Sequence, residues 1–104
     1  MQVSLLYFAD CPNWSEAGRR LRLALDQIGR PDAEIRFLVV QTEIEAGAAG
    51  FAGSPTFVVD GVDLFGDVPS PVGLTCRVYA TPAGLAGVPE VSQIVAALEK
   101  KVRS

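Results

Sequence analysis

The sequence predicts an α/β fold with a four-stranded mixed sheet and helices on its faces. Two observations lead to this class. Strand-like apolar runs alternate with segments of helical period, and Asp60-Gly61 separates two consecutive strand-like runs. The predicted order is β-α-β, an optional short helix, then β-β-α. Because 104 residues fit the usual size of one domain, residues 1–104 are expected to form a single domain.

The first half of the chain predicts a strand-helix-strand unit. Residues 3–8 are almost continuously apolar, as in a strand covered on both faces. From Trp14 the apolar residues recur at spacings of three and four, which predicts an amphipathic helix that stops at Gly29. Residues 33–40 form the second strand, so a parallel, right-handed crossover is expected. Residues 42–49 have a capping-box spacing and are compatible with a brief helix.

The second half predicts a hairpin, a long loop and a terminal helix. Residues 53–66 contain the two runs of an antiparallel hairpin. Residues 66–88 carry four glycines and three prolines and show no clear period, which predicts a long loop, apart from a strand or turn at 74–79. A proline suited to a first helical turn, Pro89, opens the last helix.

Composition excludes several classes of function. A net charge of -3 gives no cationic surface for nucleic acid, and no apolar run is long enough to span a bilayer. The N-terminus lacks a cationic leader region, so the expected location is cytoplasmic. The chain has two cysteines and no histidine, which excludes a Ser-His-Asp or Cys-His pair and a zinc site of four Cys or His ligands. Reactive, metal-touching or buried thiols remain.

Cys11 stands where the first strand meets the first predicted helix, in the stretch DCPNW. Unpaired N–H groups at a helix N-terminus stabilise a thiolate, while the charge of Asp10 opposes it, so modest activation is expected. Pro12 fits the first helical turn, and Asn13 would act as the cap if the helix began later. Trp14 is in phase with the apolar face and is predicted to be the first core residue of the helix.

At these residues the chain resembles the thioredoxin-like family. The resemblance rests on Cys11, the pair Ser54-Pro55 before the third strand, the Asp-Gly hairpin and the terminal helix. It implies that Pro55 is cis and lies against the reactive cysteine, and that exposed backbone at Ser54 pairs with the main chain of a thiol substrate. Pro12, Trp14, Ser54 and Pro55 are therefore the candidate substrate-binding residues. The family has a second cysteine or a serine where this chain has Trp14, so a vicinal disulfide is excluded, and Trp14 is expected to form an apolar wall beside the sulfur.

Cys76, in GLTCRVY, lies far along the chain in the predicted loop. It is either a resolving thiol that approaches Cys11 or a buried, inert thiol between apolar neighbours. Arg77 beside it would favour a thiolate if exposed, although most such arginines are solvated surface residues. Gly66-Asp67 weakly matches the pattern by which glutaredoxin-like members hold glutathione.

The expected function is thiol-disulfide exchange or redox sensing by a thioredoxin-like protein, with Cys11 as the catalytic thiol and Cys76 as the candidate resolving thiol. Whether the chain is an enzyme, as a thiol-disulfide oxidoreductase, is left open. No flavin, nucleotide or metal is required, and glutathione is the candidate co-substrate. The expected partners are protein or low-molecular-weight thiols and disulfides.

Two alternatives remain. Two thiolates without histidine suit linear coordination of copper(I) or mercury(II), and SPTFVVDGVDLF with GLTCRVY is similar to small actinobacterial proteins grouped with alkylmercury lyases. That chemistry requires two cooperating cysteines and an acid, which only Cys11, Cys76 and Asp10 or Asp67 would supply. The other alternative is a non-catalytic scaffold for protein association, favoured by the absence of a cysteine at Trp14.

Overall fold

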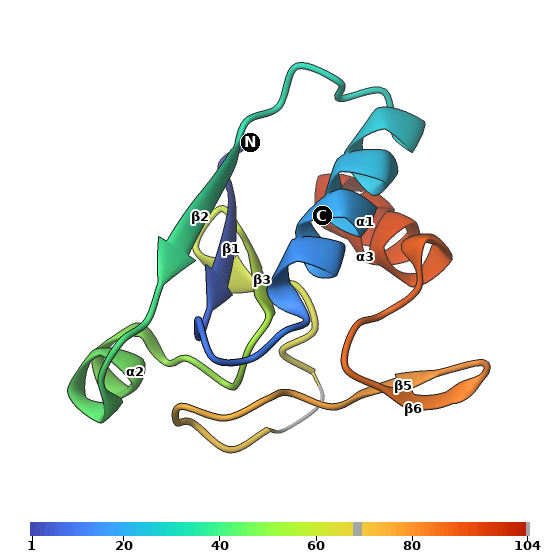
Figure 1. The fold of residues 1–104 in the computed structure, drawn as a ribbon. Helices are drawn as coiled ribbons and strands as arrows, with labels where there is room; N and C mark the ends of the chain where they lie inside the picture. Colours follow the sequence, from blue (N-terminus) through green and yellow to red (C-terminus); the bar gives the residue numbers. More distant parts are fainter. Residues whose placement is uncertain (68–69, 104) are drawn as a thin grey trace.

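The computed structural model describes residues 1–67 and 70–103 and confirms a mixed α/β architecture. Figure 1 shows the arrangement of its elements. In chain order these are β1 (Val3–Tyr7), α1 (Trp14–Gln27), β2 (Ile35–Val39), α2 (Glu43–Ala49), β3 (Thr56–Val59), β4 (Val62–Asp63), β5 (Tyr79–Thr81), β6 (Gly84–Ala86) and α3 (Val91–Arg103).

The four-stranded mixed sheet predicted from the sequence is confirmed, with the strand order β2-β1-β3-β4. β1 is parallel to β2 and antiparallel to β3, so Leu5 lies between Phe37 and Phe57. β3 and β4 form the predicted hairpin, because Asp60 and Gly61 adopt the left-handed φ angles of 51° and 81° that a two-residue turn requires.

The main core lies between one face of the sheet and the two long helices, which run side by side (Figure 1). Its buried residues come from β1, β3, α1, α3 and the segment before α3: Val3, Leu5, Ala17, Leu21, Ala24, Leu25, Phe57, Val59, Val88, Ile94 and Leu98. A smaller cluster occupies the opposite face, where Ala46 of α2 packs with Leu6, Val40 and Phe51. The sheet thus has helices on both faces, but α1 and α3 share one of them.

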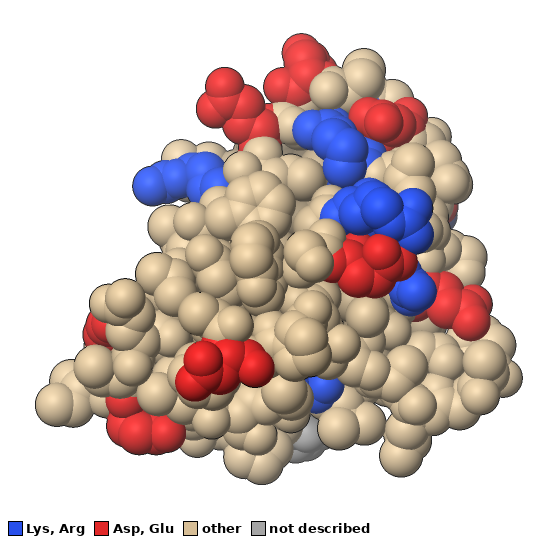
Figure 2. All heavy atoms as spheres, viewed as in Figure 1, with Lys and Arg blue, Asp and Glu red and all other residues tan. Residues whose placement is uncertain are grey.

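Charged side chains of both signs are interleaved on the face of the molecule shown in Figure 2. On α1, Glu16 accepts hydrogen bonds from Arg19 at 2.8 and 2.7 Å and from Arg20 at 2.7 Å. These bonds lower the pKa of Glu16 to about 2. Arg20 also donates to the carbonyl of Pro89 at 2.9 Å and so ties α1 to the segment before α3.

The prediction of a long loop over residues 66–88 is wrong for its second half. β5 and β6 pair as a hairpin between residues 79 and 86, separate from the main sheet. Thr81 closes the turn, because its hydroxyl accepts from Ala83 N–H at 3.2 Å and donates to Gly84 O at 2.6 Å. Strands of three residues are too short to show a period of two, so the glycines and prolines dominated the pattern.

No helix among the described residues is long and apolar enough to cross a membrane.

The core accounts for a difference between two leucines of α1. Leu21 is fully buried, whereas Leu23 is 39% exposed. Leu21→Ala should lower the free energy of unfolding by about 3 kcal/mol, because a buried leucine leaves a cavity when truncated. The control Leu23→Ala should cost less than about 1 kcal/mol. Urea unfolding of both variants measures the difference, and equal losses would contradict the assignment of the core.

Candidate thiol site

Cys11 lies in the turn that connects β1 to α1. Its N–H donates to the carbonyl of Phe8 at 2.9 Å, and α1 begins only at Trp14, with Asn13 at the N-cap position. Cys11 is therefore two residues outside the cap and not at the helix N-terminus, as the sequence predicted, and Pro12 is an exposed turn residue instead of a first-turn residue. The turn bond to Phe8 delays the start of the helix. Cys11 is only 1% exposed.

Three groups surround the sulfur of Cys11. The Cys11 thiol donates to the carbonyl of Ser54 at a sulfur–oxygen distance of 3.6 Å. The side-chain amide of Asn13 donates to the sulfur at 3.8 Å, whereas this side chain makes no capping bond to α1. The third group is the thiol of Cys76, which interacts with Cys11 from its bridge to Ser54. Asn13, predicted only as a cap, is thus a residue of the site.

Ser54 and Pro55 lie beside the sulfur of Cys11, and the peptide bond between them is cis. Ser54 is fully buried, and both of its backbone groups are bonded to its own chain. Its N–H donates to Thr75 O at 2.8 Å, and its carbonyl accepts from Arg77 N–H at 2.9 Å. The resemblance implied exposed backbone at Ser54 for a substrate, and this expectation is wrong because residues 75–77 occupy that position.

Residues 75–77, here called the Cys76 segment, bring the second cysteine to the first. Ser54 and Cys76 form a parallel β-bridge, so the two cysteines meet although they are distant in sequence. The Cys76 side of the pair is exposed, whereas Cys11 is buried. The structure therefore selects between the two predictions for Cys76: it approaches Cys11 and is not a buried thiol.

Contact with Cys11 raises the pKa of Cys76 to about 11. The hydrogen bond between the two thiols is the largest cause, followed by partial burial and by the charge on Cys11. Cys76 is therefore almost entirely a protonated thiol at neutral pH.

Arg77 is not the solvated surface residue that the sequence favoured. It is 4% exposed and forms an ion pair with Asp63 of β4 at 2.9 Å. Its guanidinium also donates to the carbonyl of Phe65 at 2.9 Å and lies 4.9 Å from the ring centre of Tyr79. Arg77 and Asp63 are residues of the site's surroundings that sequence patterns did not reveal, because their contact joins β4 to a distant point in the connection before β5.

Trp14 is half-buried and belongs to neither core cluster, so the prediction that it is a core residue is wrong. It stacks on Tyr7 with ring centres 4.5 Å apart and meets the edge of Phe37 at 6.2 Å. Trp14 thus packs toward the edge strand β2, where its neighbour Phe37 is itself 46% exposed, and not over the centre of the sheet. The ring contacts described for Trp14 are with these aromatic residues and with neither sulfur.

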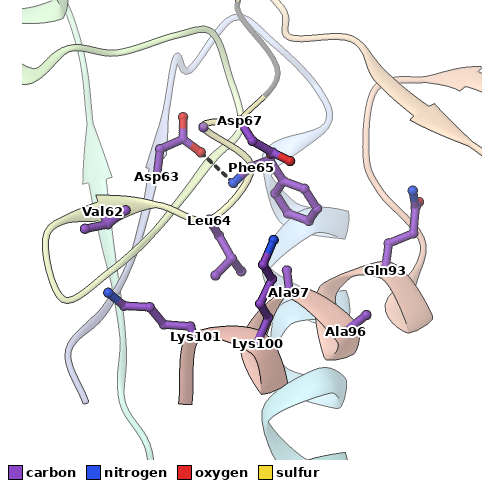
Figure 3. A pocket seen from close by; sticks show the side chains of 11 residues that line it. Val62, Asp63, Leu64, Phe65, Asp67, Gln93, Ala96, Ala97, Lys100 and Lys101 are labelled. Atoms are coloured by element: carbon purple, nitrogen blue, oxygen red, sulfur yellow. Dashed lines mark hydrogen bonds between the residues drawn. The ribbon is translucent and has the colours of Figure 1, made fainter. Parts of the chain in front are cut away.

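A pocket of about 640 Å³ lies between residues 62–67 and α3 (Figure 3). Leu64 and Phe65 form apolar walls, and Lys101 and Asp67 stand at its border. It includes neither cysteine, and Asp67 therefore faces a different hollow from the thiol pair. Asp63, which lines the pocket, connects it to Arg77.

Within residues 1–67 and 70–103, no three His, Cys, Asp or Glu side chains are grouped so that they would hold a metal ion. A metal at the thiol pair would thus have two protein ligands, the sulfurs of Cys11 and Cys76.

No protein-family model, curated protein or solved structure matches the chain.

The thiol contact predicts how Cys76 titrates. Because Cys11 favours the protonated form of Cys76, Cys11→Ala should lower the pKa of Cys76 from about 11 toward the ordinary cysteine value, roughly 8.5. At pH 9 the thiolate fraction of Cys76, and so its rate of alkylation by iodoacetamide, should rise. Peptide mass spectrometry across pH 7–12 measures the midpoint at Cys76. Ser15→Ala, an exposed change on α1, is the control, and an unchanged midpoint in Cys11→Ala would contradict the contact.

Proposed function

We propose that this protein is a thioredoxin-like dithiol protein that carries out thiol-disulfide exchange through Cys11 and Cys76. The observation that carries the proposal is that both cysteines lie at Ser54, which pairs with Cys76 in a β-bridge and accepts a hydrogen bond from the Cys11 thiol. Two thiols held beside the same residue are placed to approach each other and form a disulfide.

The thioredoxin-like assignment is supported by the order of the elements and by the environment of Cys11. The chain has a parallel β-α-β unit followed by an antiparallel hairpin and a terminal helix, and a cis proline follows the residue that contacts the sulfur. This protein differs from the family pattern in the position of its second thiol, which comes from the Cys76 segment and not from α1.

Burial favours Cys76 as the sulfur that meets an external disulfide, although the sequence predicted Cys11 for this role. Cys76 is exposed, and Cys11 lies beneath it. With a pKa of about 11, only about one Cys76 in ten thousand is a thiolate at pH 7. Attack at neutral pH therefore proceeds through this small thiolate fraction of Cys76.

The reaction then has two steps. Cys76 loses its proton to water, and its thiolate attacks one sulfur of an external disulfide R–S–S–R, so that the external S–S bond breaks and RS⁻ leaves. RS⁻ then takes the proton from Cys11, and the Cys11 thiolate attacks the Cys76 sulfur and expels the second RS⁻, which is protonated by water. The external disulfide is reduced by two electrons to two thiols, and Cys11 and Cys76 are oxidised to a disulfide. A thiol such as glutathione would reverse the sequence.

Oxidised glutathione tests the overall reaction. The wild-type monomer should lose both free thiols and two hydrogens of mass, with no retained glutathione. Cys11→Ser and Cys76→Ser should each stop at a glutathione adduct. Intact mass and thiol counting measure these products. Two thiols that are inert in the native protein but react in urea would refute the proposal and favour a non-catalytic scaffold.

The order of attack is tested separately with the same two variants. Each variant keeps one cysteine, which is Cys76 in Cys11→Ser and Cys11 in Cys76→Ser. At pH 8 the remaining Cys76 should form a glutathione adduct at least about tenfold faster than the remaining Cys11, because burial limits access to Cys11. A rapid quench of wild type followed by peptide mapping should place the early adduct on Cys76. An early adduct on Cys11 would restore the order predicted from the sequence.

The sulfur contact also supports a second candidate function, the binding of a soft cation such as copper(I). Two thiolates in contact suit linear, two-coordinate binding, and the chain contains no histidine to compete. In competition with a copper(I) chelator, the wild-type protein should bind one ion per chain. Cys11→Ser and Cys76→Ser should each fail to take copper(I) from the same chelator. Binding that survives loss of one cysteine would exclude this site.

A further inference from the structure

We infer that Arg77 is a positioning residue, which holds Cys76 in place for its reaction with Cys11. This inference rests on the proposed dithiol function. It explains how Cys76, in the connection between β4 and β5, is held beside Cys11, in the turn after β1.

The guanidinium of Arg77 binds a receptor formed by β4 and the turn after it. Nη1 donates to Asp63 Oδ2 at 2.9 Å, and Nη2 donates to Phe65 O at 2.9 Å. The second oxygen of Asp63 accepts from Phe65 N–H at 2.9 Å, the dashed bond in Figure 3. Asp63 thus fixes the carbonyl that Arg77 uses, and the two bonds orient the planar guanidinium.

Further contacts surround the same side chain. The Arg77 guanidinium lies over the ring of Tyr79, whose hydroxyl donates to Pro55 O. On the other side, the Arg77 backbone approaches Gly53, where an added Cβ would come within 3.1 Å of Arg77 Cα and 3.2 Å of its N. Gly53 has a φ of 106°, so both its conformation and this close approach require glycine.

These contacts determine the position of Cys76. The carbonyl of Thr75, the residue before Cys76, accepts from Ser54 N–H at 2.8 Å. The N–H of Arg77, the residue after Cys76, donates to Ser54 O at 2.9 Å. Cys11 is fixed separately by its turn and by its bond to Ser54 O at 3.6 Å. In the connection between β4 and β5, no described residue belongs to a helix or to a strand of a sheet. Beside this backbone pairing, the Arg77 side chain anchors the thiol-bearing segment to β4 of the sheet.

A buried ion pair is a costly way to gain stability alone. Desolvation of an arginine offsets much of its attraction to a carboxylate, and an apolar replacement is often as stable. The fork of Arg77, however, fixes direction as well as distance, which an apolar side chain would not do. The ion pair of Arg77 therefore serves to fix the position and direction of the neighbouring Cys76.

The equilibrium between the dithiol and the Cys11–Cys76 disulfide tests the inference. We would measure it in glutathione redox buffers for wild type, Arg77→Met, Arg77→Lys and Asp63→Asn. Arg20→Met is the matched control, because Arg20 also joins a carboxylate and a backbone carbonyl but lies on α1. Urea unfolding of each variant gives its stability independently, and the alkylation midpoint of Cys76 reports the thiol contact.

Arg77→Met should favour the dithiol over the disulfide by about tenfold relative to wild type, because Cys76 loses effective concentration near Cys11. Its Cys76 alkylation midpoint should move below pH 11, since the contact with Cys11 causes the raised value. Arg77→Lys should restore part of both properties through its charge opposite Asp63. Arg20→Met should lower stability and leave both properties as in wild type.

Unchanged disulfide equilibrium and midpoint in Arg77→Met, with Cys76 still paired, would overturn the inference. An equal shift of the disulfide equilibrium and of the Cys76 alkylation midpoint in Arg20→Met would also overturn the inference, because general destabilisation would then explain the effect. If Arg77→Met does not fold, Arg77→Lys and Asp63→Asn decide in the same way. Failure of wild type to form the disulfide at all is a different result, which refutes the proposed function itself.

Discussion

The backbone pairing between Ser54 and the Cys76 segment is the constraint on which the site depends. The two hydrogen bonds, at 2.8 and 2.9 Å, place Cys76 over the turn that carries Cys11. They are bonds between buried backbone groups that would otherwise be left unsatisfied, so the segment cannot leave without exposing Ser54 or replacing it with another partner. The same pairing covers Cys11 and presents Cys76. A polypeptide that entered by strand addition would first have to displace the protein's own chain.

The fold was predictable where sequence signals are local and repeated. The apolar period of α1, the Asp60-Gly61 turn and the apolar run of β1 each specify an element without distant information. An apolar run does not distinguish a central from an edge strand. Thus β1 is covered, while β2 at the sheet edge leaves Phe37 46% exposed. The β5–β6 hairpin gave no such signal, because each of its strands has three residues.

The candidate site was predictable only in part, for a related physical reason. A turn between a strand and a helix is a local feature, which is why Cys11 could be singled out. The approach of Cys76 depends on the pairing with Ser54, and the neighbouring Arg77 is bound by Asp63 of β4, a residue that resembles a solvated surface residue in sequence. Their pairing is a tertiary event, and single-sequence patterns carry no record of it. Trp14 shows the opposite error, because its helical phase predicted burial, whereas the ring packs on Tyr7 and on Phe37 of the edge strand and stays half-buried.

The separation of the two cysteines in sequence would tie any redox chemistry of the pair to folding. A vicinal pair keeps its sulfurs close even in an unfolded chain, whereas Cys11 and Cys76 meet only through the sheet and the Cys76 segment. Closing a loop of about 65 residues would restrict the unfolded chain by roughly 4 kcal/mol, so the disulfide should stabilise the native state by up to that amount. By linkage, the native fold favours the disulfide to the same extent relative to the unfolded chain. Any partner that loosens the Cys76 segment would therefore shift the pair toward the dithiol, and the redox state of the pair would report whether that segment is in place.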